Sequence, residues 1–129
     1  MIVADSSYLA AGILEDEALL RNQRILTPDL AIYETLSTIW KHQALLKRVT
    51  NGERLVDVLF DFVGTNIVIP VHPDRELAGR AFGLAVQHRT HPHDMVFVAL
   101  ALGTGLELKS FDETQLKIME EERAGASRH

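Results

Sequence analysis

Four short apolar segments are spaced along the chain, and a helical stretch follows each of them. They span residues 2–4, 25–26, 66–70 and 106–109. Segments this short suit buried strands, and β-branched residues dominate 66–70 (NIVIP). Strands that alternate with helices form a parallel sheet with helices on both faces. The sequence therefore predicts an α/β fold built around a parallel sheet.

Apolar residues at helical spacing predict the connecting helices. The predicted helices cover residues 7–23 with a break near Glu15, 28–46, 52–62, 74–88 and 113–123. Thr27 and Pro28 match a helix start, with a hydroxyl at the N-cap and proline at the first helical position. The run MVFVALALG follows Pro92 and ends at Gly103, which favours a helix buried on nearly all sides.

The composition fits one soluble domain and excludes several classes of protein. The 129 residues are 47% hydrophobic and 24% charged, so we expect a single domain over residues 1–124 and a frayed tail over 125–129. No cysteine is present, which excludes disulfides and thiolate metal sites and suits a reducing cytoplasm. The start MIVADSS lacks the basic region of a signal peptide, and no apolar run reaches the length of a membrane span. A cytoplasmic location without membrane attachment is expected.

Four acids occupy positions from which a shared site can form. Asp5 ends the first predicted strand and Asp112 follows the last, and sites in parallel sheets form at the carboxyl ends of strands. Asp94 lies in the first turn of one predicted helix, and Glu34 lies in the second turn of another. Magnesium prefers oxygen ligands and usually takes one or two carboxylates plus water and substrate phosphates. A carboxylate cluster of this kind also reconciles nucleic-acid chemistry with a net charge of −5.

Each acid also has an ordinary structural explanation. Asp5 suits the N-cap of the first helix, and Asp112 with Gln115 has the spacing of a capping box. Asp94 would be favoured near a helix N-terminus by the helix dipole, although a nearly apolar helix places it close to the core, where it needs a partner. Glu34 fits a solvated helix face. Taken singly, none of the four identifies a site.

Four sequence segments together resemble PIN domains, and in particular the VapC-type toxins of bacterial and archaeal toxin–antitoxin pairs. They are I-V-A-D-S-S, T-P-D-L-A-I-Y-E, H-D-M-V-F-V-A-L-A and L-K-S-F-D-E-T-Q-L, and their order covers about residues 2–116. The resemblance implies a three-layer α/β/α PIN-like domain with a central parallel sheet of four to five strands. The fifth strand is in doubt because Met119 to Arg123 run straight into a polar tail.

The resemblance also implies an activity and the residues that perform it. It implies a magnesium-dependent endoribonuclease, with Mn²⁺ as a possible substitute metal, that hydrolyses RNA phosphodiester bonds. The catalytic residues would be Asp5, Glu34, Asp94 and Asp112. Of these, Asp5, Asp94 and Asp112 would hold the metal, with Ser6 and Ser110 in support. The implied partners are an RNA substrate, a cognate antitoxin protein and a second copy of the chain in a homodimer.

Other functions remain open at this point. The chain could be a PIN nuclease of RNA processing rather than a toxin, or a catalytically silent PIN-like module that binds a protein. His88, His91 and His93 could form a histidine metal site or cleave RNA by acid–base catalysis without metal. A phosphoacceptor domain fits poorly, because it requires an Asp at the end of a central strand and the segment 66–70 lacks one.

Overall fold

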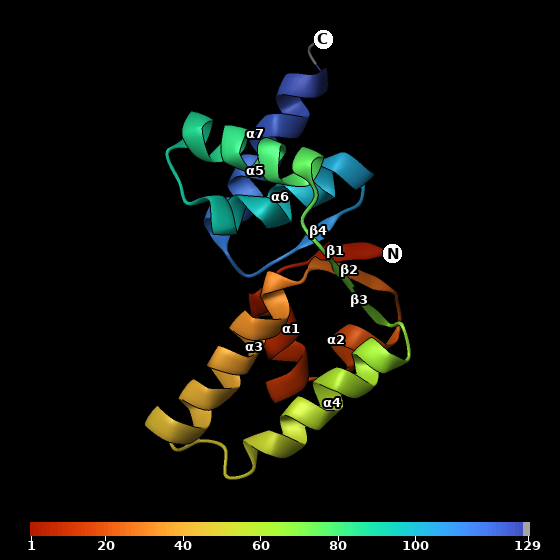
Figure 1. Ribbon diagram of the computed structural model, residues 1–129, viewed down its shortest axis with the longest axis vertical. Helices are drawn as coiled ribbons and strands as arrows, with labels where there is room; N and C mark the ends of the chain where they lie inside the picture. The colour runs from red at the N-terminus through yellow and green to blue at the C-terminus, as the bar shows by residue number, and fades with distance from the viewer. Residues whose placement is uncertain (128–129) are drawn as a thin grey trace.

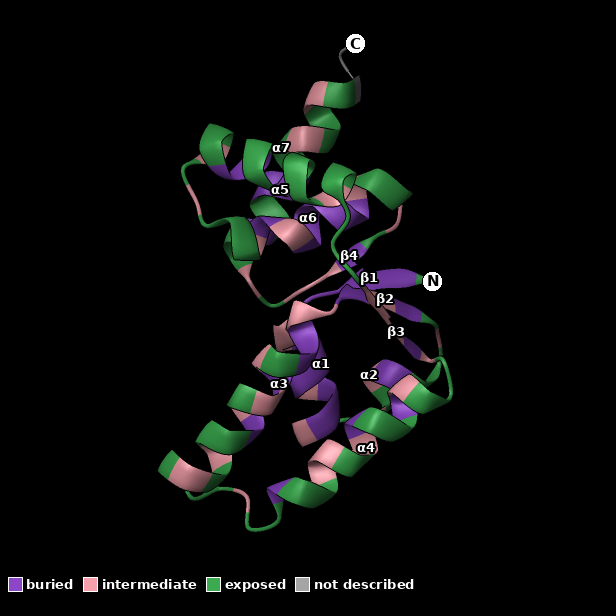
Figure 2. Ribbon diagram, viewed as in Figure 1, coloured by how far each residue is buried: buried purple, intermediate pink, exposed green. Residues whose placement is uncertain are grey.

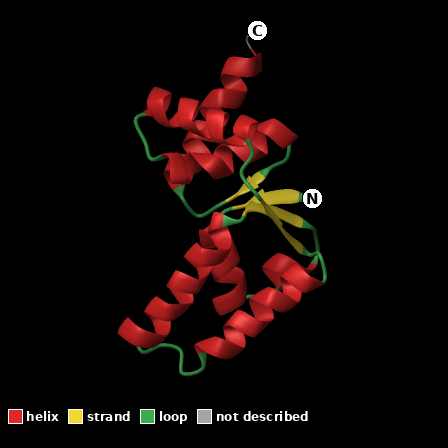
Figure 3. Ribbon diagram, viewed as in Figure 1, coloured by secondary structure: helices red, strands yellow, loops and turns green. Residues whose placement is uncertain are grey.

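The computed structural model describes residues 1–127 and places a parallel sheet between two layers of helices (Figures 1 and 3). Within these residues the sheet has four strands in the order β3-β2-β1-β4, and every pairing is parallel. The strands are β1 (Ile2–Ala4), β2 (Ile25–Pro28), β3 (Val68–Val71) and β4 (Leu108–Lys109). The predicted three-layer α/β/α fold is confirmed, with four strands in the described chain.

The helices divide between the two faces of the sheet. In Figure 1, α1 to α4 lie on one side and α5 to α7 on the other. Their bounds are α1 (Ser6–Leu14), α2 (Ala18–Arg21), α3 (Leu30–Trp40), the π-helix η1 (Lys41–Leu45), α4 (Gly52–Gly64), α5 (Arg75–His88), α6 (Pro92–Thr104) and α7 (Glu113–Ser127). None of these helices combines the length and apolar character needed to cross a membrane over the part of the chain that the structure describes.

The strand order creates a reversal beside β1. The chain adds β2 and then β3 on one side of β1, and it crosses the other face of the sheet through α5 and α6 before β4 pairs with the free edge of β1. Ligand sites in open parallel sheets form outside the carboxyl ends of strands at such a reversal. The residues that follow β1 and β4 therefore lie at the position that this topology favours for a site.

Helix α6 is buried along its middle turns, as its apolar sequence predicts. Met95, Val98, Ala99 and Ala101 have no exposed surface, and β1 is buried along its whole length (Figure 2). The helix continues to Thr104, and Gly105 beyond it adopts φ 72°. The stop predicted at Gly103 is therefore wrong by two residues, since the left-handed conformation that ends the helix belongs to the second glycine.

The boundary between β2 and α3 differs from the prediction. Thr27 and Pro28 end β2, where they pair with Pro70 and Val71 of β3, and α3 begins at Leu30. Thr27 is fully buried and its Oγ1 donates to the carbonyl of Ala4 at 2.7 Å. The hydroxyl thus joins two strands of the sheet instead of capping a helix, which is why the predicted helix start was wrong.

Two further boundaries move for local reasons. Strand β3 starts at Val68 because the Ile67 amide still donates to the Phe62 carbonyl at 3.0 Å, and Asn66 adopts φ 61°. At the C-terminus, α7 runs on to Ser127, so residues 125–127 of the predicted tail are helical. The last two residues of that tail lie outside the described residues.

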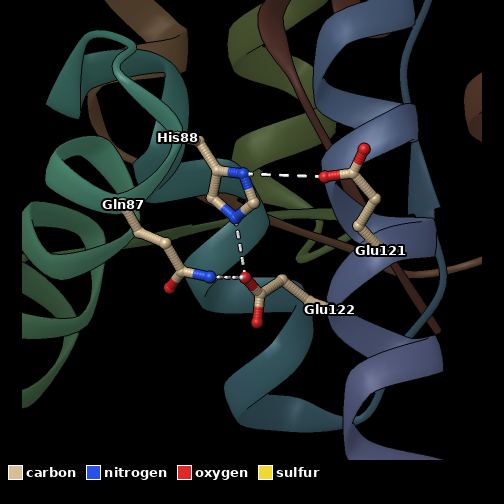
Figure 4. A network of polar contacts seen from close by, with 4 residues as sticks. All are labelled: Gln87, His88, Glu121 and Glu122. Carbon is tan, nitrogen blue, oxygen red and sulfur yellow. Dashed lines mark hydrogen bonds and ion pairs between the residues drawn. The ribbon is translucent and has the colours of Figure 1, made fainter.

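A polar network joins α5 to α7 at the end of the chain (Figure 4). The Nε2 atom of His88 lies 2.7 Å from Oε1 of Glu122, which also accepts a hydrogen bond from Gln87 at 3.2 Å. The other ring nitrogen of His88 lies 3.7 Å from Glu121. These contacts fix α7, and with it the segment that follows β4, against the α5–α6 layer.

The packing of α1 against α2 makes a prediction about two glycines. A Cβ atom on Gly12 would lie 2.5 Å from Cγ of Leu20, a fully buried residue, whereas a Cβ on Gly79 in α5 would meet nothing within 4 Å. We expect Gly12→Ala to lower the free energy of unfolding by about 1–3 kcal/mol through overpacking. Gly79→Ala is the matched control and should raise it by about 0.5–1 kcal/mol through helix propensity. Urea denaturation of both variants measures this, and equal effects would contradict the packing described.

Candidate active site

Asp5 is the buried anchor at the carboxyl edge of the sheet. It follows β1, is 3% exposed, and its amide donates to the carbonyl of Lys109 at 3.2 Å. Its Oδ1 accepts hydrogen bonds from Ser7 Oγ at 2.6 Å and from the Tyr8 amide at 3.1 Å. Its Oδ2 accepts one from Ser110 Oγ at 2.7 Å. A carboxylate has about four lone-pair positions, so these three bonds leave one for a further partner.

The segment after β4 is tied to the segment after β1. The Asp112 amide donates to Ser110 Oγ at 2.8 Å, and the Phe111 amide donates to Ser7 Oγ at 3.0 Å. Asp112 also caps α7, because its Oδ1 accepts from the Gln115 amide at 3.1 Å. The reciprocal half of the predicted capping box is missing, since Gln115 Oε1 is buried without a partner among the described residues.

The surroundings of Glu34 disfavour the charged form of its carboxyl group. Burial raises the pKa of its carboxyl above the ordinary value, and the nearby charges of Asp94 and Asp5 raise it further. A hydrogen bond from Ser6 and the proximity of His93 act in the opposite direction. Within residues 1–127, Glu34 Oε1 is buried and has no hydrogen-bond partner. An unpaired buried carboxylate oxygen destabilises the fold, so this atom is available to a ligand or cation.

Asp94 reaches the same region from the opposite helix layer. It lies in the first turn of α6, where the helix dipole favours a negative charge. Its side chain is 35% exposed, and its Oδ1 lies 3.7 Å from Nε2 of His93. The sequence placed this acid near the core. The structure instead leaves it partly in solvent beside an imidazole.

The four predicted acids are connected in two ways. Asp5, Glu34 and Asp94 share one electrostatic neighbourhood, and Asp112 joins it through the Ser110 bridge to Asp5. Over the described residues, no group of three or more His, Asp or Glu side chains is placed so that it could hold a metal ion. Magnesium often takes only one or two carboxylates and completes its shell with water and phosphate oxygens. The hard oxygen donors and the unpaired Glu34 oxygen therefore fit such an ion.

Two capping roles foreseen from the sequence are present in the structure. Asp5 is the N-cap of α1 and Asp112 bonds the first turn of α7. Capping uses one oxygen of each carboxylate. Both acids can therefore cap a helix and still present an oxygen to a ligand.

Sequence reasoning missed Ser7, and it left a site built from histidines only as an alternative. Ser7, rather than Ser6, bonds Asp5, whereas Ser6 lies near enough to Glu34 to lower the pKa of its carboxyl. The S-S pair after the first strand was the available signal, but only the fold shows which hydroxyl faces which acid. His88 is held by α7, away from His91 and His93, whose rings stack at 5.3 Å. The three histidines therefore do not gather into one site.

Comparisons with known proteins bear on the family and the fold of the chain. No protein-family model matches the chain. Ribonuclease VapC3 of Pyrobaculum aerophilum is 31% identical over 119 residues, which cover 86% of this chain and 88% of that protein.

The crystal structure of VapC20 from Mycobacterium tuberculosis, described as a sarcin–ricin loop cleaving toxin, superimposes with a TM-score of 0.68. The match covers 91% of this chain and 94% of that one at 18% identity, so it bears on the fold alone. The Pyrobaculum protein is similar enough in sequence, over enough of both chains, to show the family as well as the fold. This family is the one that the four sequence segments predicted. This chain belongs to the VapC family of PIN-domain proteins.

Proposed function

We propose that this protein is an endoribonuclease that hydrolyses RNA phosphodiester bonds with the help of Mg²⁺, and that it acts as the toxin of a toxin–antitoxin pair. Its relative is named a ribonuclease and the similar structure a toxin that cleaves the sarcin–ricin loop. The observation that carries the proposal is the buried Oε1 of Glu34, which has no hydrogen-bond partner among the described residues, in a carboxyl whose pKa is raised by burial and by the charges of Asp94 and Asp5. Acids brought together from three distant parts of the chain cost stability, which a bound cation offsets.

The residues that would hold the metal are Asp5, Asp94 and Asp112. Asp5 is fixed by three hydrogen bonds, and Asp112 is positioned through its amide and Ser110. Asp94 is partly exposed, so substrate and solvent can reach it. Mn²⁺ has the same preference for oxygen ligands and would serve as a substitute.

The reaction joins a water oxygen to phosphorus while the bond from phosphorus to the 3′ oxygen breaks. When bound, Mg²⁺ supplies positive charge that stabilises the developing charge on the phosphate oxygens. Glu34 orients the water and accepts its proton, a task for which a carboxyl with a raised pKa is suited. The leaving 3′ oxygen takes a proton from solvent. The products carry a 5′-phosphate and a 3′-hydroxyl.

The partners proposed are those of a toxin that acts on cytoplasmic RNA. An antitoxin segment would enter the acidic site with Arg or Lys on the carboxylates. A homodimer would cover apolar surface such as Phe82 and Val86, which lie one turn apart on α5 and are 63% and 64% exposed. Growth arrest on expression, relieved by a small protein encoded next to the gene, distinguishes a toxin from an RNA-processing nuclease.

Cleavage assays test the central proposal directly. We expect RNA cleavage with Mg²⁺, no cleavage with EDTA, and a loss of about a hundredfold or more in Asp94→Asn, because the substitution removes the charge of a carboxylate that would hold the metal. Mass spectrometry of the products should find 5′-phosphate ends. Equal activity with and without metal, or in wild type and variant, would contradict the proposal, and no cleavage by the wild type would favour a silent binding module.

Substitution of Ser110 tests how the acids are positioned. Ser110→Ala removes the hydroxyl that bonds both Asp5 and the Asp112 amide. We expect a 10–100-fold loss of activity, the usual effect of losing a group that orients metal ligands. The loss should be larger at low Mg²⁺ concentration. Ser37→Ala, on the exposed face of α3, is the control and should keep full activity. An active Ser110→Ala enzyme with unchanged metal dependence would rule out this role.

The raised pKa of Glu34 predicts how stability depends on pH without metal. A carboxyl whose pKa is higher in the folded state than in the unfolded chain favours folding when protonated, so this contribution is present at low pH and is lost as the pH rises above the ordinary value. At neutral pH in EDTA, Glu34→Gln should therefore unfold at a higher temperature than wild type. The difference should shrink toward pH 4.

With Mg²⁺ bound, wild type should unfold at a higher temperature than Glu34→Gln. Mg²⁺ at 100 times its dissociation constant stabilises a protein by about 2.7 kcal/mol if it binds only the folded state. Thermal denaturation should show this stabilisation by Mg²⁺ in wild type and a smaller one in Glu34→Gln. A variant no more stable than wild type in EDTA at any pH would argue against electrostatic crowding at Glu34.

A further inference from the structure

A pocket of about 290 Å³ opens at the carboxyl ends of β2 and β3, next to the candidate active site. One wall comes from the residues that follow these strands, and the other from the first turns of α5 and α6. Its lining is mainly apolar, with Pro28, Leu30, Val71, Leu77, Pro92 and Val96 among the residues that form it. This volume lies at the small end of ligand sites and suits one flat ring system.

Two polar side chains stand among these apolar walls. One is Asp29, whose Oδ2 lies 2.8 Å from Nδ1 of His72. No partner contacts its Oδ1 over residues 1–127, and Asp29 makes no capping bond to α3. The second is His93, whose side chain is half exposed. His72 therefore orients a carboxylate that keeps one oxygen free to accept a hydrogen bond in the pocket.

The pocket adjoins the acids of the candidate active site through His93. His93 lines the pocket and also lies 3.7 Å from Asp94. Leu30, another lining residue, begins the helix that carries Glu34 in its second turn. An RNA strand held with a phosphate at the acids would thus have a neighbouring base at the mouth of the pocket.

We propose that this pocket takes a nucleobase next to the scissile phosphate and that Asp29 selects it by accepting a hydrogen bond from an exocyclic amine. This inference rests on the proposed ribonuclease activity. Single-stranded RNA is read by splaying a base out of its stack into such a pocket and bonding its polar edge. Adenine, guanine and cytosine carry the amine. Uracil presents a carbonyl oxygen that a carboxylate repels, so uracil is disfavoured at this position.

Asp29→Asn tests the selection because an amide can also donate a hydrogen bond. Wild type and variant cleave a fully randomised RNA pool, and the cleaved ends are sequenced. Wild type should disfavour uracil by about tenfold at one position beside the cut, the size of one hydrogen bond to a charged group. Asp29→Asn should lose that preference and cleave sites with uracil at this position as well as sites with the other bases. The matched control is Asp57→Asn, an exposed acid on α4 in the other helix layer, which should behave as wild type.

Filling the pocket provides a second test. Ala78 lines the pocket from the exposed side of α5, and Ala78→Leu narrows it without entering the core. We expect KM for a preferred RNA to rise about tenfold while kcat changes little, since base binding is lost and the acids are untouched. Ala124→Leu, exposed on α7, is the control.

The outcomes separate this inference from the function on which it rests. No cleavage by the wild type overturns both. Cleavage with the same base preference in wild type and Asp29→Asn overturns only the base pocket. A change of oligomeric state in Ala78→Leu, measured by light scattering with base preference unchanged, would assign the pocket to a protein contact and also overturn it.

Discussion

The structure of the site depends on hydrogen bonding to one buried carboxylate. Asp5 is almost fully buried, and an ionised group in that position strongly destabilises a fold unless donors surround it. The donors come from the first turn of α1 and from Ser110, which is 105 residues away in sequence. Ser110 Oγ also accepts a hydrogen bond from the Asp112 amide. The hydroxyl that bonds Asp5 therefore also positions Asp112. The loops beyond β1 and β4 are thereby fixed together.

The other two acids have no comparable support. Glu34 lies on α3 in one helix layer, and Asp94 lies on α6 in the other. Acidic side chains from both layers therefore meet at this edge of the sheet. Glu34 keeps a buried oxygen without a partner in the described chain, and its pKa is raised by burial and by its acidic neighbours. Such local instability is typical of sites that are built for a ligand rather than for folding. The apolar pocket opens at the same edge of the sheet, next to these acids.

The sequence predicted the layers better than it predicted the contacts. Short apolar runs identified all four strands, because apolar patterning reports burial directly. Length, Pro92 and a following glycine identified the buried helix α6. Boundaries failed where a side chain had a tertiary partner: Thr27 looked like a helix cap but bonds Ala4 across the sheet. The four acids were named from the sequence and the family resemblance. The roles of Ser7 and Asp29 were not, because they depend on which way a hydroxyl and a carboxylate face once distant segments have met.

The shortness of β4 has a consequence for when the site exists. This strand has two residues, it pairs only after the whole α5–α6 layer has crossed the sheet, and the loop that follows it carries Ser110 and Asp112. Contacts of such long sequence separation form late. A growing polypeptide on the ribosome holds Asp5, Glu34 and Asp94 well before the last acid has emerged. The nascent protein therefore lacks its complete set of acids until β4 and the loop that follows it have been synthesised.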